Sequence, residues 1–216
     1  MRSTRSDASY YRADTRGLVI VQSVVMTTHN RLFPIFLKLS GRSVLVVGAG
    51  PVAASKLGAL VDAGARIHVV APIIDPEVER RGVRLSQREF RPSDLDDTWL
   101  VVAAATPDVN LQVAKEAEQR CVFVNAVDDP SHASAYLGGV THRAGVTFAI
   151  STEGRAPALA GLIREGLETV LPDADLEAWM AAAEDMRTQW RRDGIPMAAR
   201  RPLLLRALMK RYDIEV

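Results

Sequence analysis

Residues 43–56, SVLVVGAGPVAASK, carry the feature that most constrains the fold. Five apolar or small residues suited to a buried strand end at Gly48, and a helix-forming run of small residues follows at once. This is the GxGxxA pattern of a dinucleotide-binding turn. Gly48 lets the chain leave the strand tightly, Gly50 lets the backbone approach a pyrophosphate, and Ala53 allows close packing of helix and strand. The segment therefore predicts a strand, a nucleotide-binding turn and a helix.

The predicted helix supports the same interpretation through its first residues, Pro51 and Val52. Backbone amides at a helix N-terminus have no partner within the helix, and the helix dipole places partial positive charge behind them. A GxGxxA turn alone occurs by chance in Gly- and Ala-rich segments. A strand before it, an Ala-rich helix after it and a second strand at the right distance favour a nucleotide site over a merely structural turn.

From Pro34 onward, apolar runs and amphipathic segments alternate. Strands are expected at 43–48, 66–71, 83–90, 99–105 and 122–127, with helices near 51–63 and 108–120. Gly64 is suited to end the first helix, and Asp108 to open the second. Such alternation predicts a parallel α/β sheet of Rossmann type.

A dinucleotide on such a sheet lies across the carboxyl ends of the strands. Those ends fall at Gly48, Ala71–Pro72, Ala105–Thr106 and Val127–Asp128. The acid that usually binds the adenosine ribose after the second strand is missing, because Pro72 and Ile73 stand there. Either backbone groups of these two residues hold the ribose, or the turn binds no dinucleotide. No Arg follows the strand, which favours NAD over NADP.

After Asp128 the pattern changes. Residues 129–144 are expected to form a loop and 145–152 a strand, and a helix is expected to begin near Pro157. Two further helices are expected at 173–192 and about 198–211, the first with an apolar stripe that indicates a core or a subunit interface. The stripe consists of Leu176, Trp179, Met180, Ala183, Met186 and Trp190.

We therefore expect a Rossmann-type parallel sheet followed by a small dimerisation segment and a C-terminal helical domain. The expected divisions are a disordered extension at 1–30, an NAD-binding domain at 31–128, a dimerisation segment at 129–172 and a helical domain at 173–216. The first 30 residues are polar, with a short apolar patch that Gln22 and Ser23 interrupt and no cleavage pattern behind it. An export signal is therefore not expected.

Composition excludes several classes of protein. The chain has 216 residues, 48% of them hydrophobic, without an apolar run long enough to span a membrane. Its net charge of +1 argues against a nucleic-acid partner, although eight Arg or Lys residues and one acid lie between Met186 and Tyr212. The single cysteine, Cys121, has no Cys or His cluster around it and is expected to be buried. These features indicate a cytoplasmic protein without a metal site.

Four segments of the sequence carry further information about the function. FPIFLKLSGRSVLVVGAGPVAASKLGALVDAGARIHVVAP, WLVVAAATPDVN, VNAVDDP and FAISTEGRAPALAGLIREGLE occur here in that order. Together they resemble the precorrin-2 dehydrogenases, which include the N-terminal half of sirohaem synthase, from about Pro34 to Pro172. The resemblance implies oxidation of precorrin-2 to sirohydrochlorin with NAD as hydride acceptor, and in some members insertion of ferrous iron. It also implies a homodimer built through the segment after the Rossmann domain.

The resemblance assigns roles residue by residue. The family's catalytic aspartate falls on Asp128, and its nucleotide contacts fall on Pro51, Val52, Pro72 and Ile73, so the absence of the ribose acid is normal for the family. Relatives commonly carry a CDFIFP-like stretch where this chain has SAYLGGVTHRAG, and a Gly-Gly pair where it has Glu153-Gly154-Arg155. Both departures fall where the tetrapyrrole should bind, and they concern substrate detail and iron insertion more than the fold.

The chemistry suits this assignment. Precorrin-2 must lose a hydride to nicotinamide and a proton to a base, and a carboxylate at a strand end beside the cofactor can accept that proton. The alternative for Asp128 is a structural Asp that caps the turn before Pro130, while Asp129 is expected to cap the loop.

Substrate contacts are expected near the same edge. The family's substrate is a polycarboxylate, so Arg155, Arg143 and the basic C-terminal helices are candidates to hold it, the alternative being a solvated basic face. Ser151 and Thr152 could donate hydrogen bonds in the cleft or simply cap the next turn. His132 and His142 flank the site, where packing is a commoner role than metal ligation.

Three functions remain open from the sequence. The first is the NAD-dependent dehydrogenase, with or without iron insertion. The second is a chelatase with vestigial NAD binding, against which the retained glycine turn speaks. The third is a non-enzymatic module that binds NAD or a tetrapyrrole, which would tolerate loss of Asp128.

Overall fold

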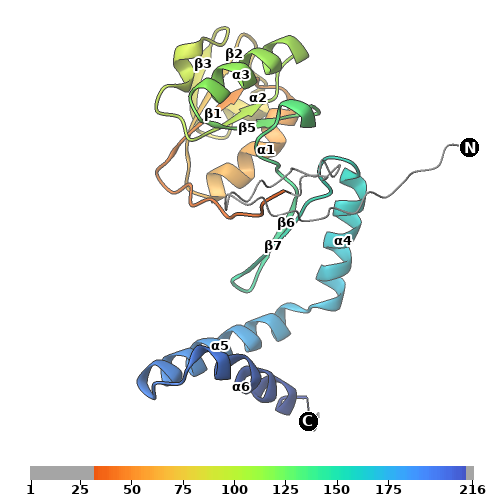
Figure 1. Cartoon of the computed structure of the whole chain (residues 1–216). Helices are drawn as coiled ribbons and strands as arrows, with labels where there is room; N and C mark the ends of the chain where they lie inside the picture. The colour runs from red at the N-terminus through yellow and green to blue at the C-terminus, as the bar shows by residue number, and fades with distance from the viewer. Residues whose placement is uncertain (1–31, 213–216) are drawn as a thin grey trace, which may run out of the picture. The chain divides into compact units, whose positions relative to one another are not determined.

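The computed structural model describes residues 32–212 (Figure 1). The predicted N-terminal extension, residues 1–30, lies wholly outside the described residues. By its internal contacts the chain divides into Met1–Phe36 and Leu37–Val216, and every helix and strand discussed below belongs to the second unit.

A five-stranded parallel sheet with the strand order β3-β2-β1-β4-β5 forms the first part of this unit. Its strands are β1 (Ser43–Val47), β2 (Arg66–Ala71), β3 (Arg84–Gln87), β4 (Leu100–Ala103) and β5 (Phe123–Ala126). The helical elements between them are α1 (Pro51–Asp62), α2 (Pro76–Glu79), the 3-10 turn η1 (Pro92–Leu95) and α3 (Pro107–Gln119). The predicted Rossmann-type parallel sheet is confirmed.

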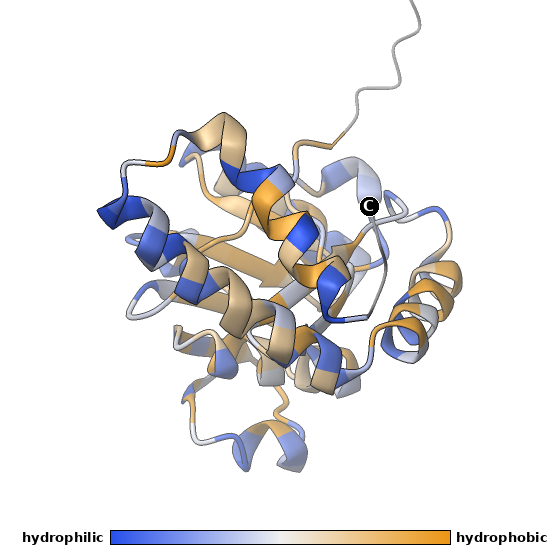
Figure 2. Ribbon diagram, turned by 90° about the horizontal axis from the view of Figure 1, so that it is seen from below, coloured by the Kyte–Doolittle hydropathy of each residue, from blue (hydrophilic) through white to orange (hydrophobic). Residues whose placement is uncertain are grey.

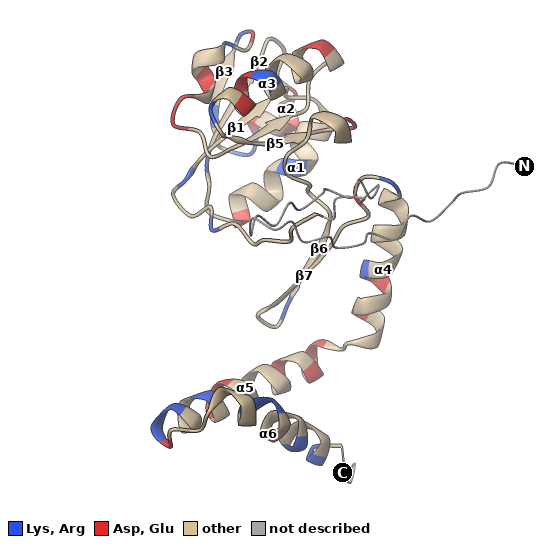
Figure 3. Ribbon diagram, viewed as in Figure 1, with Lys and Arg blue, Asp and Glu red and all other residues tan. Residues whose placement is uncertain are grey.

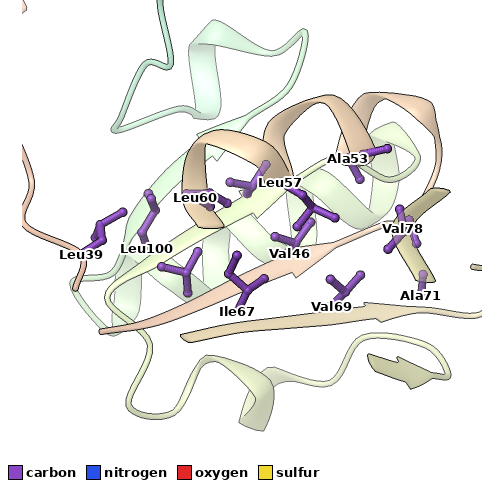
Figure 4. Packing of buried hydrophobic residues seen from close by; sticks show 14 residues of the cluster. Leu39, Val46, Ala53, Leu57, Leu60, Ile67, Val69, Ala71, Val78 and Leu100 are labelled. Carbon is purple, nitrogen blue, oxygen red and sulfur yellow. The ribbon is translucent and has the colours of Figure 1, made fainter. Parts of the chain in front are cut away.

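Two apolar layers hold this sheet, one on each face. On one face Leu57 and Leu60 of α1 pack with Val46 and Val69, which are less than 5% exposed (Figure 4). On the other face Val113 and Ala117 of α3 pack against the remaining side chains of the strands. The central strands β1 and β4, buried on both faces, are almost continuously apolar, and strand ribbon in the hydrophobic colour is visible between the helices in Figure 2.

Helix ends follow the expected chemistry. Pro51 and Pro107 occupy the first positions of α1 and α3, where a missing N–H costs no helical hydrogen bond. Gly64, with φ +71°, follows the end of α1 in the left-handed conformation that glycine adopts without strain. Asp108 lies in the first turn of α3, beside the positive end of the helix dipole.

The segment after β5 was predicted as a loop up to residue 144, and this prediction is wrong. The chain forms a 3-10 turn, η2 (Pro130–His132), and then an antiparallel hairpin of β6 (Gly139–Arg143) and β7 (Val146–Ile150). The pair Gly138-Gly139 at the start of β6 is atypical of a strand, but contacts in the folded chain require glycine at position 138 and leave little room at 139. A Cβ on Gly138 would overlap the Ile150 carbonyl oxygen, and one on Gly139 would lie 3.3 Å from the Ala160 carbonyl oxygen.

Three helices complete the chain: α4 (Pro157–Val170), α5 (Asp173–Arg192) and α6 (Met197–Lys210). Helix α4 packs on the hairpin, and α5 packs on α6. The predicted stripe of α5 faces inward, with Leu176 and Trp190 buried and its other members half-buried. Trp179 Nε1 donates to Tyr212 Oη at 2.8 Å, which in turn donates to Asp175 at 2.6 Å, so the end of the described chain is fixed to α5.

Candidate cofactor and substrate site

Steric constraints require glycine at position 48 of the turn. Its φ is +102°, and a Cβ there would overlap the carbonyl oxygen of Ala104 and lie 2.9 Å from Ala105 N. The Gly48 amide donates to Val70 O at 2.9 Å, so the turn is tied to β2 as well. Only glycine combines this backbone conformation with this approach to the end of β4.

Gly50 has a different role from Gly48. Its φ is −86°, which any residue can adopt, and no atom lies within 4 Å of an added Cβ. The first amide of α1 bonded within the helix is that of Ala54, which donates to Gly50 O at 3.0 Å. Pro51 has no N–H, so the amides of Val52 and Ala53 are the donors left at this end. Open space in front of free amides is the geometry of a phosphate cradle.

The end of β2 lies beside the glycine turn, because β1 and β2 are paired. Pro72 and Ile73 are exposed, Ile73 by 81%, and the following Asp75 N–H donates to Ala49 O at 3.0 Å. The Asp75 carboxylate accepts from Glu77 N at 2.8 Å and caps α2, so its role is structural. An exposed isoleucine beside the glycine turn offers an apolar surface to an adenosine.

The turn after β4 lies beside the glycine turn, because β1 and β4 are neighbours. Thr106 is exposed and stands at the N-cap of α3 without a side-chain hydrogen bond to the helix. One residue here was missed at the level of sequence: Asn110, only 5% exposed, accepts the Ala105 N–H through Oδ1 at 2.9 Å. A polar residue in the first turns of a helix that is otherwise packed on the sheet was the available signal.

Asp128 follows β5 with φ +60°, a left-handed conformation that Asp and Asn adopt more readily than most residues. Its side chain is exposed, and among residues 32–212 no group forms a hydrogen bond with its carboxylate. The Asp129 carboxylate instead accepts from Ser131 Oγ and bonds His132 Nδ1, both at 2.6 Å. Asp129 stands at the N-cap position of η2 without a side-chain cap hydrogen bond, so the cap predicted for it is replaced by bonds to these two side chains.

The hydrogen bonds of Asp129 favour the charged form of its carboxyl group. The hydroxyl of Ser131, and next the ring of His132, hold the pKa of the Asp129 carboxyl below its ordinary value. His132 therefore pairs with a carboxylate through Nδ1. Because Ser131 also bonds this carboxylate and lies 3.1 Å from the same ring nitrogen, the three side chains do not form the linear relay of a nucleophilic triad.

Ser151, Thr152 and Arg155 lie in the turn between β7 and α4. Ser151 Oγ accepts from Glu153 N at 3.1 Å, and Thr152 Oγ1 accepts from Ala156 N at 3.2 Å, so both cap this turn as in the structural alternative. The turn adjoins η2, since a Cβ on Gly154 would lie 3.0 Å from Pro130 Cγ. The Arg155 side chain is 72% exposed, with Glu153 at 3.6 Å, and remains available to a ligand.

Arg143, in contrast, is engaged within the fold. Its Nε donates to Asp173 at 2.6 Å and its guanidinium to Glu168 O at 2.8 Å, and the hydrogen bond to Asp173 raises the pKa of the guanidinium. The expectation that it holds substrate is therefore replaced by a structural role between the hairpin and the helices. His142 bonds Thr147 within the hairpin at 3.0 Å. Across residues 32–212, no group of three or more His, Cys, Asp or Glu side chains is arranged to hold a metal ion.

A groove of about 360 Å³ lies away from the strand ends, between the second half of α3 and the segment after η2. Its lining includes Lys115, Cys121, Phe123 and His132 but none of the residues predicted for cofactor or substrate. Cys121 is exposed here, so the prediction that it is buried is wrong. The cause is its φ of +54°, because it occupies the turn that ends α3 instead of a core position.

The basic residues of the tail gather on the second half of α5 and along α6 (Figure 3). Seven of them are exposed: Arg187, Arg191, Arg192, Arg201, Arg206, Lys210 and Arg211. No helix in residues 32–212 is both long and apolar enough to cross a lipid bilayer.

Comparison with known proteins agrees with this geometry. Residues 35–139 match a family model described as "Putative NAD(P)-binding". The chain is 45% identical over 146 residues to a siroheme synthase of Photorhabdus laumondii and 40% identical over 180 residues to siroheme synthase 1 of Aeromonas salmonicida. Over these residues the chain is similar in sequence to siroheme synthases. The resemblance seen in the sequence is thereby confirmed.

The similarity to these relatives is partial in length. It covers 65% and 81% of this chain but only 31% and 38% of the two siroheme synthases, so the chain spans about a third of their length. Among solved structures, "SirC, precorrin-2 dehydrogenase" aligns with a TM-score of 0.63 at 26% identity, covering 81% of this chain and 88% of that one. The Rossmann-type sheet with its C-terminal helices is thus shared with a protein of similar length.

Proposed function

We propose that this protein catalyses the NAD-dependent oxidation of precorrin-2 to sirohydrochlorin. The observation that carries the proposal is the exposed carboxylate of Asp128, free of structural hydrogen bonds at the end of β5, on the same sheet edge as the glycine turn. The substrate class comes from the relatives, which are named as a precorrin-2 dehydrogenase and as siroheme synthases.

The reaction assigns a task to each part of the cleft. Gly50 and the amides of Val52 and Ala53 would hold the pyrophosphate, Pro72 and Ile73 the adenosine, and the turn at Thr106 the nicotinamide half. Bound NAD supplies the hydride acceptor. The macrocycle gains a double bond by losing a hydride and a proton, and the Asp128 carboxylate would accept the proton, so that the oxidation balances to sirohydrochlorin, NADH and one proton.

NAD is proposed in preference to NADP because of charge. No Arg or Lys occurs from Ala71 to Pro76, where a 2′-phosphate would need one, and Asp75 and Glu77 add negative charge nearby. On the substrate side, Arg155 and the basic residues of α5 and α6 would bind the carboxylates of the macrocycle. Ser151 and Thr152 would offer their hydroxyls beside it while capping their turn.

The test is an anaerobic assay of precorrin-2 with NAD, followed by the absorbance of NADH and of the tetrapyrrole, with NADP in a parallel reaction. Stoichiometric NADH and sirohydrochlorin are expected. The same assay with sirohydrochlorin and ferrous ion as substrates tests iron insertion, which the proposal includes as a second activity. Binding of NAD without turnover of precorrin-2 would contradict the dehydrogenase and favour a binding module, whereas iron insertion alone would favour a chelatase.

We also propose that the active form is a cytoplasmic homodimer joined through α4. Leu162 and Val170 are 64% and 75% exposed, and Leu159 and Ile163 extend the same apolar surface. Leu162→Glu is expected to convert the dimer to a monomer in analytical ultracentrifugation. Val61→Glu, which changes an exposed apolar residue on α1, is the matched control and should leave the dimer intact. A dimer that survives in Leu162→Glu would place the interface elsewhere.

A further inference from the structure

The turn after β4 occupies the point of the sheet where ligands of doubly wound folds bind. Strands β1 and β4 are neighbours, and the helices that follow them cover opposite faces of the sheet. The chain therefore leaves β1 and β4 in opposite directions, and a crevice forms between the two turns. One wall of this crevice is Gly48 to Gly50, and the other is Ala104 to Thr106.

The second wall is fixed from three sides. The Ala104 amide donates to Val47 O at 2.8 Å, and the Ala104 carbonyl lies against Gly48, which has no side chain to displace it. Oδ1 of Asn110 accepts the Ala105 N–H at 2.9 Å and holds the next residue of the turn. The backbone N–H of Asn110 donates to Thr106 O at 2.9 Å, so Asn110 bonds both Ala105 and Thr106.

The side-chain nitrogen of Asn110, Nδ2, has no hydrogen-bond partner among residues 32–212, although the residue is only 5% exposed. No fully buried side-chain nitrogen or oxygen in the described part of the chain lacks a partner, so Nδ2 must reach the surface. Since Oδ1 is held by the Ala105 N–H, the two N–H groups on Nδ2 are the part of this side-chain amide that is left for a ligand.

We propose that Asn110 positions the dinucleotide: Oδ1 fixes the turn that forms one wall of the crevice, and Nδ2 donates a hydrogen bond to the bound cofactor. The inference rests on the proposed NAD site and adds to it a specific side-chain donor. A dinucleotide in the crevice presents acceptors to that wall, namely the pyrophosphate oxygens, the ribose hydroxyls and the carboxamide oxygen. An asparagine is the right residue for both tasks, because its amide carries an acceptor and a donor in one plane.

Two substitutions separate the tasks. Asn110→Asp keeps an oxygen for the Ala105 N–H but replaces the donor with a second oxygen, while Asn110→Ala removes both. In isothermal titration, Asn110→Asp is expected to weaken NAD binding by about tenfold or more with a melting temperature close to that of the wild type. Asn110→Ala should weaken binding as much and also melt earlier, since a buried N–H is left unpaired.

Gln112→Glu is the matched control, because it makes the same amide-to-carboxylate change at an exposed position of the same helix. It should bind NAD as the wild type does. With precorrin-2 and NAD, the Asn110→Asp variant should show a raised KM for NAD and a kcat reduced less, as expected for lost cofactor binding.

The outcomes distinguish the inference from the proposed function. Failure of the wild-type chain to bind NAD would refute the cofactor site itself. Wild-type binding with unchanged affinity in Asn110→Asp would refute the donor role of Asn110 and leave the proposed function standing. Should Asn110→Ala fail to fold, the Asn110→Asp titration alone decides between these results.

Discussion

Gly48 and Ala104 lie back to back at the ends of β1 and β4, where a Cβ on Gly48 would stand 2.6 Å from the Ala104 carbonyl carbon. The two walls of the cofactor crevice are therefore packed against each other at their base. At Gly50, two residues further on, an added Cβ would have no other atom within 4 Å. The fold therefore requires glycine at position 48, whereas at position 50 only the proposed approach of a pyrophosphate requires it.

Gly48→Ala is expected to destabilise the protein. The methyl group adds steric overlap with Ala104 to a φ of +102° that L-residues rarely adopt, and together these cost about 3 kcal/mol or more. Urea unfolding followed by circular dichroism measures this loss. A variant as stable as the wild type would mean that the β4 end can move away freely.

Gly50→Val is expected to spare the fold and abolish NAD binding. The backbone at Gly50 is extended, so valine is tolerated, but its side chain would fill the space in front of the Val52 and Ala53 amides. Isothermal titration with NAD and a thermal melt on the same sample measure both effects. Unchanged affinity in a folded Gly50→Val variant would show that the pyrophosphate does not approach the turn.

Local sequence patterns predicted much of the fold. The sheet, its strand positions and the roles of Gly48, Gly64 and Pro51 follow from such patterns, because strand burial and helix ends depend on nearest neighbours. Strand β7 was also predicted, but its partner β6 was missed, because glycines are depleted in strands and the Gly138-Gly139 pair is explained only by contacts with Ile150 and Ala160. Asn110 was missed for the same reason, since its partner Ala105 is fixed by tertiary structure.

The division of labour between Asp128 and Asp129 likewise needed the structure. From the sequence, either aspartate could cap the turn before Pro130. In the structure only Asp129 is bonded, through the side chains of Ser131 and His132. Asp128 is exposed, with a φ of +60°, and neither property could be read from the sequence around it.

Salt is expected to weaken precorrin-2 binding more than NAD binding. If the exposed cations of α5 and α6 attract a polycarboxylate, the KM for precorrin-2 should rise as NaCl is raised from about 50 to about 500 mM, because the Debye length falls well below 10 Å. Replacement of Arg201 and Arg206 together by Gln should reduce that salt dependence. Arg80→Gln, an exposed change beside α2, is the control. Equal salt responses for both ligands would remove the tail from substrate binding.

The stability conferred by Asp129 should depend on pH. Its pKa is lower in the folded chain than in the unfolded one, because Ser131 and then His132 bond the carboxylate. The stabilisation is therefore complete above the unfolded pKa and is lost as the pH falls below about 4 through the folded pKa. Urea unfolding of wild type and Asp129→Asn from pH 7 to pH 3 should show a difference that shrinks on acidification. Ser131→Ala should retain part of this dependence, and a difference independent of pH would contradict the assignment.

Asp128→Asn is expected to lower the rate of precorrin-2 oxidation without affecting the fold. Asparagine keeps the size of the side chain and adopts the left-handed conformation at φ +60° as readily as aspartate, but it cannot accept a proton. A positioned general base contributes about 10²–10⁴-fold, so kcat should fall within that range while the affinity for NAD and the melting temperature stay close to those of the wild type.

The neighbouring aspartate provides the control for this last experiment. Asp129→Asn alters the bonds to Ser131 and His132 and should lower stability at neutral pH, with a much smaller loss of kcat. If the protein also inserts iron, the Asp128 carboxylate could accept the pyrrole protons that the metal displaces, so both activities should fall together in Asp128→Asn. Full dehydrogenase turnover in that variant would refute Asp128 as the base. Loss of folding instead of rate would return Asp128 to a structural role in the turn after β5.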